Sequence, residues 1–145
     1  MIYADITGWG KCAPPARLTN DDLSTFLDTS DDWIYSRTGM KERRISHVPV
    51  SDLAHVACAR ALAAAGKSAL DVDLIIFGSC SFDQIVPNAA SRVQQLLNAD
   101  NAACIDLNTA CTSGMYALSV ATAMIRTGSV RNALVIGAEV ISVLQ

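Results

Sequence analysis

Short apolar runs alternate with helical patterns along the second half of the chain. The apolar runs occupy residues 73–78, 102–107 and 132–138. Continuous runs of this length are typical of strands that are covered on both faces. Helices are expected between them, from just after Pro87 to about Leu97 and then as far as Gly128. This order predicts an α/β fold, with a mixed, largely parallel sheet covered by helices on both faces.

The first half of the chain predicts one strand and three helices. Residues 2–9 are rich in strand-forming residues and end among glycines, which predicts the first strand. The expected helices run from a cap at Thr19 or Asn20 to Leu27, from a cap at Ser30 to about Tyr35, and from Ser51 or Asp52 to a stop at Gly66.

Composition narrows the class of protein. Of the 145 residues, 51% are hydrophobic and 17% are charged, and the formal net charge is -3. These values exclude a disordered chain and give no electrostatic support for nucleic-acid binding. The start of the chain does not resemble a secretory signal, so a cytoplasmic location is expected. Residues 107–125 carry no charge, but polar Asn, Ser and Thr side chains interrupt them, which favours a buried helix and no membrane span.

Five cysteines are present, and one of them lies where chemistry is expected. Their odd number and wide spacing, without a C-x-x-C pair, argue against a disulfide framework and a zinc site. Cys111 lies between an apolar strand and the long uncharged helix. A helix N-terminus stabilises a thiolate, and its N–H groups can stabilise an oxyanion. The alternative for Cys111 is a small buried hydrophobe, which is the interpretation adopted for Cys12, Cys58, Cys80 and Cys104.

A nucleophilic thiol usually needs a neighbouring base. The chain has two histidines, His47 in a polar extended stretch and His55 on the expected exposed side of a helix. Neither is suitably placed, so we expect the base to lie outside this chain.

Two segments resemble the β-ketoacyl-acyl carrier protein synthase III family. They are residues 28–39, DTSDDWIYSRTG, and residues 110–118, ACTSGMYAL. Further landmarks agree in order and spacing at residues 41–43, Gly66, residues 87–90 and residues 133–137. The resemblance covers essentially the whole chain and implies a thiolase-like fold of two similar halves. Residues 1–145 match the N-terminal half, and the C-terminal half is absent from this chain.

The resemblance implies a decarboxylative Claisen condensation by a homodimer in the synthesis of fatty acids or related lipids. An acyl-CoA acylates Cys111, and malonyl carried on acyl carrier protein then loses carbon dioxide and attacks the thioester. Both compounds are substrates, so no separate cofactor is implied. The catalytic His and Asn of the family come from its second half. The isolated chain is therefore expected to lack condensing activity.

The resemblance also implies a substrate site. Thr29, Trp33 and Arg37 match positions that contact coenzyme A, and an indole face, a guanidinium and a hydroxyl suit adenine and phosphate. The alternatives are a helix-packing tryptophan and surface ion pairs from the arginine. Val86 stands where well-known members carry a phenylalanine that limits the acyl pocket across the dimer interface. The smaller side chain predicts acceptance of longer primers.

Two other functions remain open at this stage. One is acyl transfer through Cys111 to another acceptor without condensation. The other is a non-catalytic structural subunit that binds acyl chains, against which the retained Cys111 argues.

Overall fold

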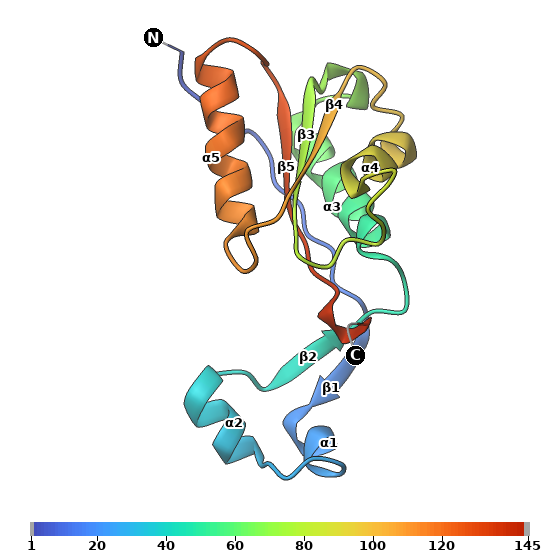
Figure 1. Ribbon diagram of the computed structural model, residues 1–145, viewed down its shortest axis with the longest axis vertical. Helices are drawn as coiled ribbons and strands as arrows, with labels where there is room; N and C mark the ends of the chain where they lie inside the picture. The colour runs from blue at the N-terminus through green and yellow to red at the C-terminus, as the bar shows by residue number, and fades with distance from the viewer. Residues whose placement is uncertain (1, 144–145) are drawn as a thin grey trace.

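A three-stranded parallel sheet forms the centre of the computed structural model, which describes residues 2–143 (Figure 1). The strands are β3 (Leu74–Gly78), β4 (Ala103–Leu107) and β5 (Ala133–Gly137), in the order β4-β3-β5. Leu74 pairs with Ala103 on one side and with Ala133 on the other. The three expected strands are therefore confirmed, each slightly shorter than predicted. The expected domain bounds, Met1 and Gln145, lie outside the described residues.

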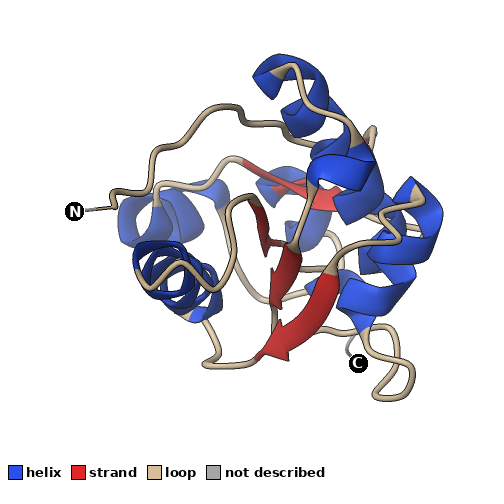
Figure 2. Cartoon of the chain, turned by 90° about the horizontal axis from the view of Figure 1, so that it is seen from above, coloured by secondary structure: helices blue, strands red, loops and turns tan. Residues whose placement is uncertain are grey.

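Helices cover both faces of this sheet (Figures 1 and 2). Helix α5 (Ser113–Arg126) lies on one face, and α3 (Val50–Ala65) and α4 (Ala89–Leu97) lie on the other. Strand β3 is buried along its whole length: Leu74 and Ile76 pack toward α5, while Ile75 and Phe77 pack in the core formed with α3 and α4. Burial on both faces explains the continuous apolar run and confirms the predicted α/β class.

A small second unit, residues 16–45, extends beyond the carboxyl edge of the sheet (Figure 1). Its strands β1 (Ala16–Thr19) and β2 (Glu42–Ile45) pair antiparallel, with α1 (Asn20–Ser24) and α2 (Asp31–Thr38) between them. The helix caps predicted at Thr19 and Ser30 are confirmed. Helix α1 ends before Leu27, and α2 continues beyond Tyr35. The sequence did not predict the strands, since each is four residues long and β2 is rich in charge.

The predicted strand over residues 2–9 is wrong. This segment is extended but forms no strand ladder. At Gly8 and Gly10 its backbone lies directly against α3, where an added Cβ would overlap the carbonyl oxygens of Ala61 and Ala57. Packing on a helix has replaced strand pairing here, and a cavity of about 670 Å³ separates residues 4–12 from β5.

The uncharged segment 107–125 is divided between three local structures. It holds the last residue of β4, a turn, and most of α5, whose Ala117 and Ala121 are buried. Within residues 2–143, none of the helices is long and apolar enough to cross a membrane. The predicted helix is confirmed, but it is buried on one side only, since Met115 and Tyr116 of α5 are 69% and 55% exposed.

Short 3₁₀ turns, residues Ala69–Asp71 and Ile141–Val143, complete the described structure. The loop between β3 and α4 is attached to the helices beside it. The Asp83 carboxylate accepts hydrogen bonds from the N–H groups of Val50 and Ser51, at 2.7 and 3.1 Å, and so caps α3. The Asp106 carboxylate does the same for Ala89 and Ala90 at the start of α4, at 2.8 Å each. Both contacts hold helix N-termini close to the carboxyl edge of the sheet.

Candidate active site

Cys111 lies in a tight turn between β4 and α5, with its side chain exposed. Thr112 is the N-cap residue of α5, and Cys111 immediately precedes it. The residue before the cysteine, Ala110, has a φ of 53°, in the left-handed region that residues other than glycine rarely adopt. Such a backbone costs about 1 kcal/mol and persists where surrounding contacts hold it. The exposed thiol is inconsistent with the alternative of a buried structural cysteine.

Side chains of the turn fix its shape from within. Ser113 is buried, and its Oγ accepts a hydrogen bond from the N–H of Thr109 at 2.9 Å and donates to the carbonyl oxygen of Ala110 at 2.7 Å. The hydroxyl of Thr112 donates to the carbonyl oxygen of Thr109 at 2.8 Å. The residues that form these bonds lie on both sides of Cys111 in the sequence. They therefore hold the thiol at the start of α5, where N–H groups and the helix dipole favour negative charge.

Replacement of Ser113 by alanine is expected to loosen this turn. The variant loses both hydrogen bonds of the hydroxyl, each contributing about 0.5–1.5 kcal/mol, so alkylation of Cys111 by iodoacetamide should change several-fold. The rate at Cys111 is followed by peptide mass spectrometry. Ser119→Ala is the matched control, because Ser119 lies on the same helix and only donates to its own backbone at Met115. Equal rates at Cys111 in both variants and the native protein would contradict the role of Ser113.

Polar residues from two other loops lie at the same edge of the sheet as Cys111. Residues Ser79, Cys80 and Ser81 directly follow β3, and Glu139 follows β5. The Glu139 carboxylate accepts hydrogen bonds from the Ser81 hydroxyl at 2.6 Å, the Cys80 N–H at 2.9 Å and the Ser79 hydroxyl at 3.1 Å. Burial alone would raise the pKa of Glu139, but these bonds outweigh it and hold the pKa below its usual value. Glu139 is therefore an anion at neutral pH.

Glu139 was not predicted from the sequence, and the prediction that Cys80 is a small buried hydrophobe is wrong. Cys80 is exposed, whereas Cys58 is buried, and burial raises the pKa of the Cys58 thiol to about 12. A usable signal was present, since side chains that follow the carboxyl ends of parallel strands gather at one edge. The rule applies to the residues that follow β3 and β5.

The predicted coenzyme A contacts are grouped on and next to α2. The Trp33 side chain is 54% exposed, and the Arg37 guanidinium carbon lies 4.3 Å from the centre of its ring. Arg37 also donates to the carbonyl oxygen of Trp33 at 3.2 Å. The Thr29 hydroxyl is buried and has no hydrogen-bond partner within the described residues. The structure thus brings these three residues to one place, with an aromatic face and a guanidinium on the surface.

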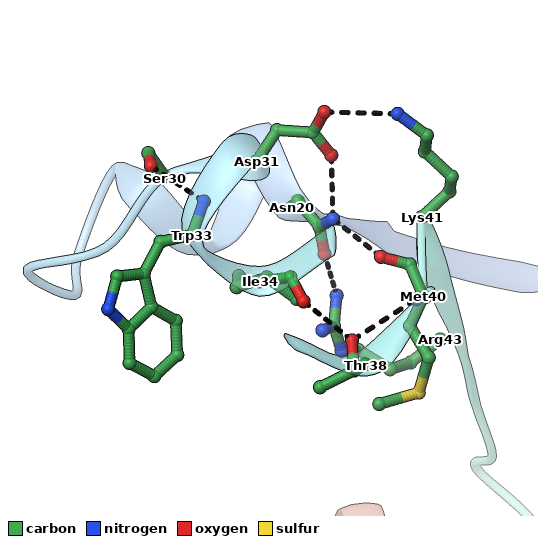
Figure 3. A network of polar contacts seen from close by, with 9 residues as sticks. All are labelled: Asn20, Ser30, Asp31, Trp33, Ile34, Thr38, Met40, Lys41 and Arg43. Carbon is green, nitrogen blue, oxygen red and sulfur yellow. Dashed lines mark hydrogen bonds and ion pairs between the residues drawn. The ribbon is translucent and has the colours of Figure 1, made fainter. Parts of the chain in front are cut away.

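A polar network supports this part of α2 (Figure 3). The Asn20 side-chain amide donates to the Asp31 carboxylate and to the carbonyl oxygen of Met40, both at 2.7 Å, and its oxygen accepts from Arg43. Lys41 pairs with Asp31 at 3.1 Å. The indole of Trp33 points away from this network. The network therefore orders the helix that carries Trp33 without occupying the ring itself.

The other predicted residues lie apart from Cys111. Val86 belongs to the loop before α4 and is 84% exposed, beside Ile85, which is 90% exposed. His47 is exposed and His55 is half-buried on α3. No polar contact described between residues 2 and 143 joins either histidine, or α2, to the Cys111 turn.

Comparisons with known proteins agree with this fold and this turn. A model of the 3-oxoacyl-[acyl-carrier-protein] synthase III family matches residues 105–144, which include Cys111. A protein of Vibrio vulnificus named beta-ketoacyl-[acyl-carrier-protein] synthase III 2 is 60% identical over 97% of this chain and 39% of its own length. A synthase III of Clostridium acetobutylicum is 46% identical over 98% of this chain and 44% of its own.

Solved structures give the same result. The 3-oxoacyl-[acyl-carrier-protein] synthase III of Aquifex aeolicus has a TM-score of 0.92 and 40% identity, over 94% of this chain and 45% of that one. The priming β-ketosynthase of the R1128 polyketide pathway has a TM-score of 0.83 and 30% identity, over 87% of this chain and 38% of that one. The fold and the cysteine turn thus define a thiolase-like α/β protein.

Along nearly its whole length, the chain is similar to proteins of the 3-oxoacyl-[acyl-carrier-protein] synthase III family. It spans about two fifths of the length of the curated relatives that it matches, 39% of the Vibrio protein and 44% of the Clostridium protein.

Proposed function

We propose that this chain is the N-terminal half of a condensing enzyme that joins an acyl-CoA primer to malonyl-acyl carrier protein. The observation that carries the proposal is the exposed Cys111 at the start of α5, inside the segment that the family model matches. The relatives are named 3-oxoacyl- or β-ketoacyl-acyl carrier protein synthases, which supports the same reaction class.

In the proposed first half-reaction, the Cys111 thiolate attacks the carbonyl carbon of acyl-CoA. The carbon–sulfur bond to coenzyme A breaks, coenzyme A leaves as a thiol after gaining a proton, and the acyl group stays on Cys111. The helix N-terminus favours the thiolate and the developing oxyanion. In the second half-reaction, malonyl-acyl carrier protein loses carbon dioxide. The resulting carbanion attacks the thioester, which gives 3-oxoacyl-acyl carrier protein and frees Cys111.

Groups for proton transfer and for decarboxylation would come from outside this chain, from a C-terminal half and within a homodimer. Neither His47 nor His55 has a described polar contact with the Cys111 turn, which supports this division. Acyl transfer to another acceptor uses the same Cys111 and is the second candidate.

The test compares this chain with the enzyme extended by its downstream coding sequence, using acyl-CoA and malonyl-acyl carrier protein. We expect 3-oxoacyl-acyl carrier protein from the extended enzyme and none from this chain alone. Release of carbon dioxide in step with product separates condensation from simple acyl transfer. Condensation by this chain alone would refute the proposal that part of the active site lies outside it. Acyl transfer by the extended enzyme without release of carbon dioxide would favour the second candidate function, acyl transfer to another acceptor.

Trp33 and Arg37 should support binding of coenzyme A, because an indole face can stack on adenine and a guanidinium can hold a phosphate through several donors. Loss of either contact is expected to weaken acyl-CoA binding roughly tenfold, equivalent to about 1.4 kcal/mol. Isothermal titration of Trp33→Ala and Arg37→Ala in the extended enzyme measures this. Ser36→Ala is a suitable control, since Ser36 is exposed on the same helix and its hydroxyl donates only to the backbone at Trp33. Unchanged affinity in folded Trp33 and Arg37 variants would leave both residues with a packing or surface role.

Val86 is expected to permit primers longer than acetyl. It replaces a bulky aromatic, and each methylene that is buried in the space contributes about 0.8 kcal/mol. Specificity constants for acetyl-CoA and a medium-chain acyl-CoA are compared in the native enzyme and in Val86→Phe. The variant should lose the longer primer selectively, and Ile85→Val serves as a neighbouring control. A native preference for acetyl-CoA, or an unchanged ratio in Val86→Phe, would show that another residue sets the limit.

A further inference from the structure

Two exposed thiols lie at the same edge of the sheet. Cys80 follows β3 and Cys111 follows β4, and these strands are neighbours in the sheet. Their pairing continues past the strand ends, because the N–H of Ser79 donates to the carbonyl oxygen of Leu107 at 3.1 Å. If Cys111 carries acyl groups as proposed above, a second thiol beside it creates a chemical problem. A thiolate at Cys80 could take the acyl group instead, or accept it from Cys111 by thioester exchange.

Glu139 contacts Cys80 at two atoms. One carboxylate oxygen, Oε1, accepts the backbone N–H of Cys80 at 2.9 Å, and the other, Oε2, accepts the thiol at 3.5 Å. The distance of the second contact suits a sulfur donor. The same carboxylate holds Ser79 and Ser81, both buried, so its position is fixed from three consecutive residues. No such carboxylate contact is found for Cys111 among the hydrogen bonds described.

The charges around Cys80 favour its protonated form. Burial, the hydrogen bond to Glu139, the negative charge of Glu139 and the charge of Cys111 all raise the pKa of the Cys80 thiol, in that order of size. Glu139 and Cys111 are the titratable groups that act on it from the segments packed against the loop. Glu139 is itself an anion at neutral pH, so its effect persists through the range in which an unperturbed thiol ionises.

We propose that Glu139 determines which of the two thiols reacts. By accepting a hydrogen bond from the Cys80 thiol, it keeps Cys80 protonated and leaves acyl transfer to Cys111. Glu139 is thus a specificity-determining residue that acts through Cys80. This proposal rests on the proposed role of Cys111 as the acyl acceptor.

The first experiment measures alkylation of each cysteine by iodoacetamide across pH in the extended enzyme, with peptide mass spectrometry to separate the sites. Glu139→Gln preserves size and removes the charge. We expect alkylation of Cys80 near neutral pH to rise about tenfold, with its pH midpoint moved downward. Ser81→Ala is the control that perturbs the same network without removing the charge, and it should change the Cys80 rate less than twofold. Equal effects of the two variants would reduce Glu139 to a structural role and overturn the proposal.

A second measurement needs no change at Glu139. In Cys111→Ala, the pH midpoint for Cys80 alkylation should lie above that of a free thiol, about 8.5. A midpoint at or below that value would overturn the proposal even if Glu139→Gln does not fold.

The final experiment treats the native and Glu139→Gln enzymes with acyl-CoA and locates the acyl group. Acyl label should remain confined to Cys111 in the native enzyme and appear on Cys80 in the variant. If the native enzyme shows no label at Cys111, the proposed function fails, while the alkylation profiles still decide the effect of Glu139 on Cys80. If Cys111 is labelled but the variant leaves Cys80 unlabelled and unalkylated, the proposal about Glu139 fails alone.

Discussion

Replacement of Cys111 by alanine is expected to abolish covalent acylation of the extended enzyme by acyl-CoA. The thiol is exposed at the N-terminus of α5, and no other group in the turn can form a thioester. Removing a nucleophile of this kind lowers the rate by on the order of a thousandfold or more. Mass spectrometry of the intact protein and its peptides measures the label.

The control for this experiment is Cys104→Ser, because Cys104 lies within β4, half-buried and only a few residues away. It should retain nearly all acylation. Label that persists in Cys111→Ala, or that maps to another cysteine in the native enzyme, would contradict the assignment.

Gly78→Ala is expected to damage both stability and acylation. Gly78 ends β3, and an added Cβ would lie 2.7 Å from the backbone carbonyl carbon and oxygen of Ser113 and 3.0 Å from the N of Gly114. The obstructing atoms belong to the backbone of the first turn of α5, so no flexible side chain can move aside. Overpacking of this kind costs about 1–3 kcal/mol, and relief would require α5 to shift together with the Cys111 turn.

Chemical denaturation and the rate of Cys111 acylation together measure this effect. Gly137→Ala is a closely matched control, since Gly137 is the register partner of Gly78 on β5. Its added Cβ would meet only the Cα of Gly114, at an ordinary 3.6 Å. Equal losses in the two variants would show that the contact between β3 and α5 is not what positions the cysteine.

The alternation of strands and helices was predictable because it follows from burial. A strand such as β3, covered on both faces, must be apolar at every position, and that signature is visible without a partner. The segment 2–9 shows the limit of the same reasoning. Its composition suits a strand, but whether it pairs depends on a neighbour that no local pattern reveals, and Gly8 and Gly10 instead let it pack on α3.

In the candidate site, too, local features were predictable from the sequence and contacts between distant residues were not. Cys111 was identified because a cysteine between a strand and a helix is a local feature. The contact between Cys80 and Glu139 joins positions 59 residues apart in the sequence, so it became visible only once β3 and β5 were paired. The pairing of β1 with β2 was not predictable for the same reason, since it joins residues far apart in the sequence, such as Ala16 and Ile45.

The unit of residues 16–45 contains one buried apolar side chain, Ile34, and one buried polar side chain, Asn20. An element with so little apolar burial opens more readily than the sheet does. Any ligand held by Trp33 and Arg37 therefore binds only the fraction of molecules in which this unit is formed. Its apparent dissociation constant is the intrinsic value divided by that fraction, so residues that never touch the ligand, such as Asn20, can set its measured affinity.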